Sequence, residues 1–130
     1  MGYPIAEAAR RSGLSIDTLR YYERIKLLDP PARDASGRRV YSDADLVWLR
    51  LLTKLRGTGM SIRRMREYAA LRKLGAASAG RRKAMLVEQR VALAERITQL
   101  RASLELLDYK IDNYERMERE GSKVRLDAST

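Results

Sequence analysis

The first 30 residues contain two short amphipathic segments separated by a turn. Hydrophobic positions three or four residues apart predict one helix over residues 5–11 and another over residues 16–24. Gly13 interrupts the pattern, and Ser15 is a favourable residue for capping the start of the second helix. Two short helices joined by a tight turn that contains glycine predict a helix-turn-helix.

The segment after the second helix is rich in turn-forming residues. Pro30 and Pro31 stop any helix, residues 34–37 have the composition of a turn, and residues 38–41 have that of a strand. We therefore predict a small hairpin, or wing, at this position.

Two longer helices are predicted next. Ser42 caps a helix over residues 43–56, which ends at residues 57–59, and Ser61 starts another helix that runs to about residue 74. The first turn of this last helix is basic instead of acidic. Basic side chains there are unfavourable for the helix dipole, but they suit a helix end whose free N–H groups receive a phosphate.

The hydrophobic pattern changes after residues 75–80, a run of small residues that we interpret as a linker. A heptad repeat then predicts a helix over residues 81–120, followed by a short polar tail at residues 121–130. The apolar seam of the repeat consists of Leu86, Leu93, Ile97, Leu100, Leu104, Leu107, Ile111 and Tyr114, with Arg90 as the exception. A lone helix cannot bury such a stripe, so the seam predicts a partner helix, and its Ile and Leu positions by themselves favour a parallel pair.

The composition excludes several kinds of chemistry. The 130 residues include no Cys and no His, so disulfides, thiolate metal sites, cysteine nucleophiles and histidine catalysis are ruled out. Acidic pairs such as Asp43 and Asp45 are better explained as first-turn helix charges, because their spacing does not place them on one face. We expect neither an enzyme nor a bound metal or other cofactor.

The formal net charge of +10 is unevenly distributed. Residues 1–80 contain 16 Lys and Arg against 8 Asp and Glu, whereas residues 81–130 contain 11 against 9. The first part is suited to a polyanion, either nucleic acid or an anionic membrane, and charge alone does not choose between them. No apolar run approaches the roughly 20 residues of a membrane span and no signal peptide is evident, so we expect a cytoplasmic protein without membrane partners.

The order of six short sequence motifs favours nucleic acid over a membrane as the partner. They are IAEAA at 5–9, SGLS at 12–15, TLRYYE at 18–23, LL at 27–28, GRRVYS at 37–42 and GMSI at 59–62. Together they closely resemble the DNA-binding domain of bacterial MerR-family transcription regulators over residues 3–74. In architecture the resemblance extends to about Arg119.

This resemblance implies an all-α fold with a small β-hairpin wing. A winged helix-turn-helix over residues 1–74 would be followed by a long helix that dimerises as an antiparallel coiled coil with a second copy. The implied DNA contacts are Thr18, Arg20, Tyr21, Tyr22, Arg38, Arg39, Tyr41, Arg56, Ser61, Arg63 and Arg64. Tyr22 lies three residues after Leu19, so packing explains its position at least as well as DNA contact does.

The implied function is control of transcription. A homodimer would bind a pseudo-palindromic site in double-stranded promoter DNA and would bend and untwist it for RNA polymerase. Many relatives sense metals, oxidants or electrophiles through cysteines, which this chain lacks. We also expect it to lack the separate ligand-binding domain of the drug-sensing members. A non-metal small-molecule effector would therefore use the dimer itself. The side chains that could line its pocket are Trp48, Tyr68, Met85 and Tyr109, although packing explains them as well.

Two positions depart from the family pattern. The resemblance implies that Ser15 to Glu23 form the recognition helix, which enters the DNA groove. Lys26 stands where many relatives have Gly, so the chain leaves this helix either through a costly left-handed residue or by another path. Arg38 occupies a wing position that is often aromatic, which changes the details of the wing's contacts.

Two other functions stay open at this stage. One is an architectural or developmental DNA-binding protein of the same fold that responds to no effector. The other is a coiled-coil interaction module whose basic head binds a protein or an anionic membrane. The interaction-module hypothesis assigns no role to the wing or to the Arg20-Tyr21-Tyr22 run.

Overall fold

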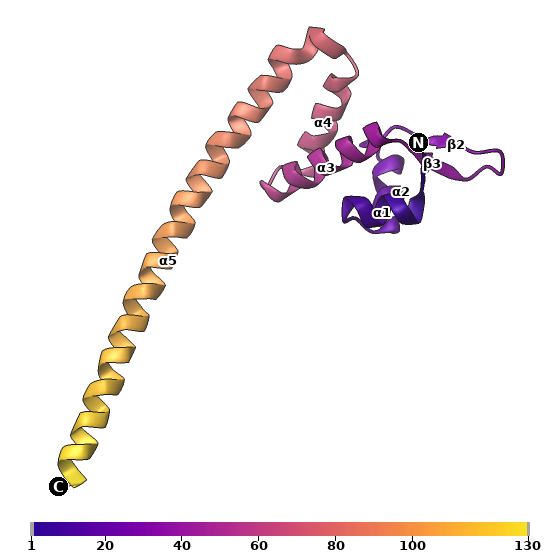
Figure 1. Cartoon of the computed structure of the whole chain (residues 1–130). Coiled ribbons are helices and arrows are strands. Elements are labelled where there is room, and N and C mark those ends of the chain that lie inside the picture. Colours follow the sequence, from indigo (N-terminus) through magenta and orange to yellow (C-terminus); the bar gives the residue numbers. More distant parts are fainter. Residues whose placement is uncertain (1, 130) are drawn as a thin grey trace. The chain divides into compact units, whose positions relative to one another are not determined.

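The structure is a computed structural model that describes the backbone of residues 2–129 and the side chains of residues 2–122. Its helices are α1 (Ile5–Ser12), α2 (Ile16–Arg24), α3 (Asp43–Gly57), α4 (Ile62–Arg72) and α5 (Ala79–Ser129), with a 3-10 turn, η1 (Gly75–Ser78), before α5. Its strands are β1 (Tyr3–Pro4), β2 (Ala32–Arg33) and β3 (Arg39–Tyr41). This arrangement confirms the predicted fold class, helical with a small wing (Figure 1). Backbone contacts divide the chain into two compact units between Arg90 and Val91.

The three predicted serine caps are all present. The Ser15 hydroxyl accepts a hydrogen bond from the Thr18 N–H at 3.0 Å, and Ser61 caps α4 in the same way. Ser42 forms a complete capping box, because Asp45 also accepts from the Ser42 N–H at 2.9 Å. These local hydrogen bonds satisfy backbone donors that a helix start leaves free, which explains why the starts could be located from the sequence.

The sheet has one strand more than the predicted hairpin. Its order is β1-β3-β2 and all pairing is antiparallel, with Tyr3 opposite Tyr41 and Ala32 opposite Val40. The strand that was not predicted, β1, has only two residues and leads directly into α1. A segment this short carries no alternation of polar and apolar residues, so its pairing with β3 depends on contacts distant in sequence.

One hydrophobic core lies beneath these elements. It includes Ala8 of α1, Leu19 of α2, Leu49 and Leu52 of α3, and Met65 of α4, all of them buried. Met85 also belongs to this core, although it lies on α5. The first unit therefore extends past the predicted linker and includes the first turns of α5.

Residues 75–80, interpreted from the sequence as a linker, form a hydrogen-bonded corner. The Ser78 side chain is buried, and its hydroxyl donates to the carbonyl oxygens of Leu71 and Gly75. Arg82 reaches back to donate to Ser78 Oγ at 3.0 Å and to the Gly75 carbonyl at 2.8 Å. Small residues let the chain fold closely here, and the polar groups of Ser78 and Arg82 hold the corner in place.

The last helix continues further than predicted. The sequence indicated a helix to residue 120 and a tail at 121–130, whereas α5 runs to Ser129. Gly121 costs a helix only about 1 kcal/mol relative to alanine, and no proline follows it to end the helix. A single glycine is therefore a weak stop signal. None of the helices in residues 2–129 is long and apolar enough to cross a lipid bilayer.

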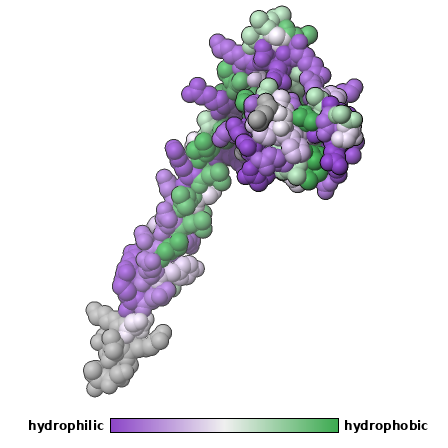
Figure 2. Space-filling model, turned by 45° about the vertical axis from the view of Figure 1, so that its right-hand side comes forward, coloured by the Kyte–Doolittle hydropathy of each residue, from purple (hydrophilic) through white to green (hydrophobic). Residues whose placement is uncertain are grey.

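The second unit consists of α5 from Val91 onwards and exposes the predicted seam. Leu100, Leu104 and Leu107 each leave 58–59% of their surface exposed. Figure 2 shows hydrophobic side chains gathered along this helix between polar ones. Within the described residues nothing covers this stripe, which is far more apolar surface than a helix in water normally presents.

Candidate nucleic-acid interface

The helix α2 separates a buried face from an exposed one. Leu19 is fully buried and Tyr22 is 6% exposed, so both face the core. Arg20 and Tyr21 follow Leu19 by one and two residues, which turns them away from the buried face, and both are exposed. This leaves an arginine and a tyrosine side by side on a capped helix, able to donate hydrogen bonds to base edges and phosphates.

Neighbouring side chains restrict the exposed tyrosine of α2. The Arg24 guanidinium lies over the Tyr21 ring at 5.5 Å, and the Tyr21 and Tyr22 rings are 6.2 Å apart. A cation over an aromatic face limits how far the ring can move. At the start of the helix, the Thr18 and Ser15 hydroxyl oxygens lie 2.8 Å apart, so half-buried Thr18 is partly engaged in the cap.

Asp34 stabilises the turn at the tip of the wing through hydrogen bonds to the backbone. Its Oδ1 accepts hydrogen bonds from the N–H groups of Arg38 at 3.0 Å and Ser36 at 2.9 Å. These bonds, that from Arg38 first, hold the pKa of Asp34 below its usual value. Arg33 donates to the Gly37 carbonyl at 2.7 Å across the same turn. The turn thus presents Arg38 on an ordered, exposed loop.

Two of the predicted wing contacts are engaged or buried within the fold. Arg39 donates to Glu23 of α2 at 2.7 Å, and both side chains are less than a third exposed. Tyr41 is fully buried, and its hydroxyl is a buried polar group without a hydrogen-bond partner among the described residues. Burial raises the pKa of Tyr41 above its ordinary value. A phenol enclosed in the core cannot reach a phosphate in this conformation, so we leave Tyr41 out of the contacts proposed below.

The start of α4 offers a second basic surface. Arg63 is almost fully exposed, with its side chain 90% accessible and Glu67 only at 3.9 Å. Arg64 is less available, because it donates to Glu88 at 2.7 Å and to Glu67 at 3.3 Å. Arg56 donates to the Met60 carbonyl at 2.9 Å and so supports the turn before the Ser61 cap. Of the three predicted arginines, Arg63 is the one that is free to bind.

The structure places the predicted effector residues in two different settings. Trp48, Tyr68 and Met85 are buried in the core, where the Trp48 and Tyr68 rings stack at 6.1 Å. The Trp48 indole N–H donates to the Leu27 carbonyl at 2.8 Å, and the Arg72 guanidinium lies 4.1 Å from the ring centroid. Tyr109 is exposed in the second unit. The first three side chains have the contacts of packing residues, and an effector pocket stays a prediction.

Comparison with known proteins decides the family. Residues 3–71 match the family described as MerR HTH family regulatory protein, and residues 46–120 match that described as MerR, DNA binding. An HTH-type transcriptional regulator of Haemophilus influenzae is 35% identical over 122 residues, which cover 94% of this chain and 90% of that protein. The chain belongs to the MerR family.

Solved structures of MerR proteins have the same fold. A MerR family transcriptional regulator from Listeria monocytogenes is 41% identical with a TM-score of 0.82, covering 87% of this chain and 86% of that one. HiNmlR, described as a MerR family regulator lacking the sensor domain and bound to promoter DNA, is 35% identical with a TM-score of 0.83. That match covers 93% of this chain and 96% of HiNmlR. This MerR protein is therefore a DNA-binding transcriptional regulator.

Sequence reasoning missed several side chains of the MerR interface. Arg24 and Arg33 support the recognition helix and the wing turn, and Glu23 joins the two through Arg39. The spacing of charges along the chain gives no signal for these roles, because each depends on elements brought together by the fold. The left-handed conformation considered for Lys26 is confirmed, with a φ of 64°.

Proposed function

We propose that this MerR regulator binds a pseudo-palindromic promoter site as a homodimer and bends and untwists the DNA for RNA polymerase. The observation that carries the proposal is the exposed pair Arg20 and Tyr21 on a capped helix whose opposite face is fully packed. Such a helix can enter the major groove without losing core contacts. The binding of HiNmlR to promoter DNA supports this assignment, since the two chains match over nearly their whole length.

The proposed DNA contacts fall into two groups, those to bases in the major groove and those to the DNA backbone. Arg20, Tyr21 and Thr18 would contact base edges or adjacent phosphates in the major groove. Arg38 on the wing, with Ser61 and Arg63 at the start of α4, would hold the DNA backbone on either side. Arg39, Arg56, Arg64 and Tyr22 would position these groups, because each is already engaged or buried.

The proposed dimer rests on the seam of α5. Six of its side chains between Ile97 and Tyr114 are at least 40% exposed, which makes a continuous apolar stripe available to a second copy. Burying a leucine of this kind contributes about 1.5–3 kcal/mol, so one stripe against another supplies ample stabilisation. A dimer with two recognition helices would read two half-sites related by symmetry, as a pseudo-palindrome requires.

Selection of bound genomic fragments by the purified protein tests the proposal, followed by footprinting and transcription from the best site. We expect a pseudo-palindrome within a promoter spacer and a change in transcript yield when protein is added. Sequence-independent binding would contradict the proposal and favour the architectural alternative. Failure to bind any duplex would favour the interaction module.

An effector-independent regulator is the second candidate. Trp48, Tyr68 and Met85 are packed side chains, which favours structural roles for the residues that could have lined an effector pocket. If an effector exists, it must bind the repressing and activating states with different affinity. Transcription from the selected site, measured with and without cell extract metabolites, would separate a constitutive from a responsive regulator.

A further inference from the structure

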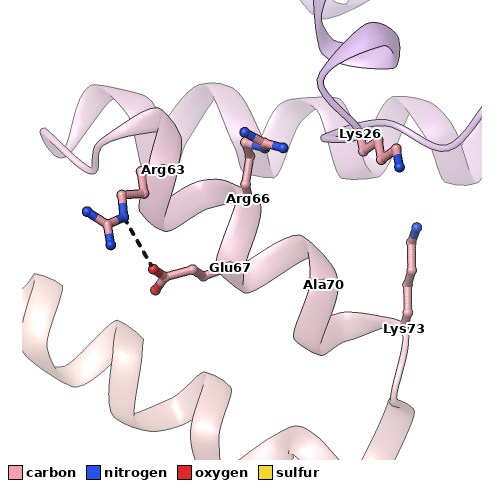
Figure 3. Close-up of a pocket in the computed structure, with 6 residues that line it drawn as sticks. All are labelled: Lys26, Arg63, Arg66, Glu67, Ala70 and Lys73. Atoms are coloured by element: carbon pink, nitrogen blue, oxygen red, sulfur yellow. Dashed lines mark ion pairs between the residues drawn. The ribbon is translucent and has the colours of Figure 1, made fainter.

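A basic groove of about 490 Å³ lies between the loop after α2 and the outer side of α4 (Figure 3). Its lining residues are Lys26, Arg63, Arg66, Glu67, Ala70 and Lys73. Figure 3 shows the ammonium groups of Lys26 and Lys73 pointing into the groove from opposite sides. Four cationic side chains thus line a groove of the size that small-molecule ligands occupy.

The carboxylates nearby neutralise only part of this charge. Glu67 is shared between Arg64 at 3.3 Å and Arg63 at 3.9 Å, and Asp29 pairs with Lys73 at 3.1 Å. Among the side chains of residues 2–122, no carboxylate oxygen lies within 4.0 Å of the cationic groups of Lys26 or Arg66. The groove therefore keeps an excess of positive charge that an anion would stabilise.

Lys26 occupies its place at a conformational cost. Its φ of 64° is in the left-handed region, where glycine is cheaper by about 1 kcal/mol, and it is the one residue other than glycine with positive φ in the described chain. The Lys26 N–H donates to the Glu23 carbonyl at 3.2 Å, and Trp48 donates to the next carbonyl, that of Leu27, at 2.8 Å. The backbone is thus held in this conformation, and a lysine there places its charge beside the groove. Strained residues of this kind gather at binding sites.

We propose that this groove binds phosphate groups through Lys26, Arg66 and Lys73, which line it together with the proposed backbone contact Arg63. Two ammonium groups and the Arg66 guanidinium approach from different sides, which matches the several acceptor oxygens of a phosphate. The phosphate comes either from a free phosphorylated molecule or from the DNA backbone. The two sources share the same chemistry and are separated by the experiment.

The test uses the only tryptophan of the chain as a reporter. Its indole N–H donates to Leu27, one residue after Lys26, so its single NMR cross-peak responds to any change in the loop. Inorganic pyrophosphate is titrated into the full-length protein at constant ionic strength. A free phosphate ligand gives a saturable shift of this peak. The double variant Arg66→Gln/Lys73→Gln should weaken the affinity roughly tenfold or more, and Lys26→Asn, which tolerates the left-handed conformation, should weaken it as well.

A matched control removes the same charge elsewhere. Arg116 and Arg119 lie on the exposed side of α5 away from the seam, so Arg116→Gln/Arg119→Gln should leave pyrophosphate binding unchanged. If the control loses as much affinity as the groove variant, the effect is one of net charge and the proposal is overturned.

Whether the DNA backbone supplies the phosphate is tested by measuring the affinity for duplexes of unrelated sequence over a range of salt concentrations. If the backbone supplies the phosphate, the groove variant lowers affinity for every sequence and reduces the salt slope by about two, while the control does not. The proposal is overturned if pyrophosphate binding does not saturate and the groove variant leaves the salt slope of DNA binding unchanged. Arg20→Ala separates this outcome from a failure of the proposed function, because it tests sequence recognition with the groove intact.

Discussion

Arg38 and Arg39 are adjacent in the sequence but have different roles in the wing. Arg39 is held by Glu23 at 2.7 Å, whereas the Arg38 side chain is exposed and only its backbone N–H is engaged, by Asp34. The same contrast separates Arg64, which pairs with Glu88, from exposed Arg63. Arg39 and Arg64 are therefore less available to DNA than Arg38 and Arg63, because carboxylates of the fold already hold them closely.

Arg20→Ala and Arg63→Ala should weaken DNA binding in different ways. Arg20 is proposed to contact base edges, so its loss should weaken binding by about 1–3 kcal/mol on the selected site and by much less on unrelated DNA. Arg63 is proposed to contact a phosphate, so its loss should lower the affinity equally for all sequences and should decrease the salt slope by about one. Equilibrium binding at several salt concentrations measures both, and a flat response to both variants would contradict the interface.

Tyr41→Phe should leave the protein as stable as before or stabilise it by about 1 kcal/mol. The hydroxyl is buried without a partner among the described residues, so its removal ends a desolvation cost and leaves the ring packing intact. Urea unfolding followed by circular dichroism measures the change. A clear loss of stability would mean that the hydroxyl has a partner, such as a buried water.

At the scale of elements, α1 depends on one acidic side chain. Glu7 accepts from Arg10 Nε at 3.0 Å and from Arg11 Nε at 2.9 Å, and these two bonds, that from Arg10 first, lower the pKa of Glu7 to about 2. A carboxylate with a depressed pKa stabilises the fold above its ordinary pKa of 4.5, and this contribution is lost as the pH falls toward 2. Protonation of Glu7 should therefore loosen α1 in acid.

Glu7→Gln should reduce the free energy of unfolding at neutral pH. The difference in this free energy between the variant and the unsubstituted protein should disappear as the pH falls from 4.5 to about 2. Unfolding curves at a series of pH values check this. Glu118→Gln on α5 is the control, and it should follow the original protein throughout. If the difference in unfolding free energy does not change with pH, the charge of Glu7 does not contribute to stability through its ion pairs.

The elements that could be predicted are those with local signals. Serine caps and amphipathic spacing located α2, α3 and α4, because each signal lies within the helix it starts. The strand β1 and the corner at residues 75–80 could not be predicted, since β1 is defined by pairing with β3 and the corner by Ser78 and Arg82. The family motifs implied which helix would read DNA, but not which arginines would be held by Glu23 and Glu88.

At the scale of the whole molecule, the proposed dimer should depend on the seam of α5. Leu100→Lys/Leu107→Lys places two charges in the stripe, so we expect a monomer and the loss of high-affinity operator binding. Leu106→Lys is a matched control, because Leu106 is as exposed as its neighbours but lies outside the seam. Sedimentation velocity distinguishes monomer from dimer. A monomer in the unsubstituted protein would contradict the seam hypothesis.

The buried position of Met85 has a consequence for dissecting the chain. A fragment ending at Leu74, where the family motifs stop, would lose Met85 from the core and the Ser78 hydroxyl from the last carbonyls of α4. Its α4 would fray and its apolar underside would be open to water. The smallest fragment expected to fold independently and to suit isolated expression therefore ends near Arg90, where the first unit ends.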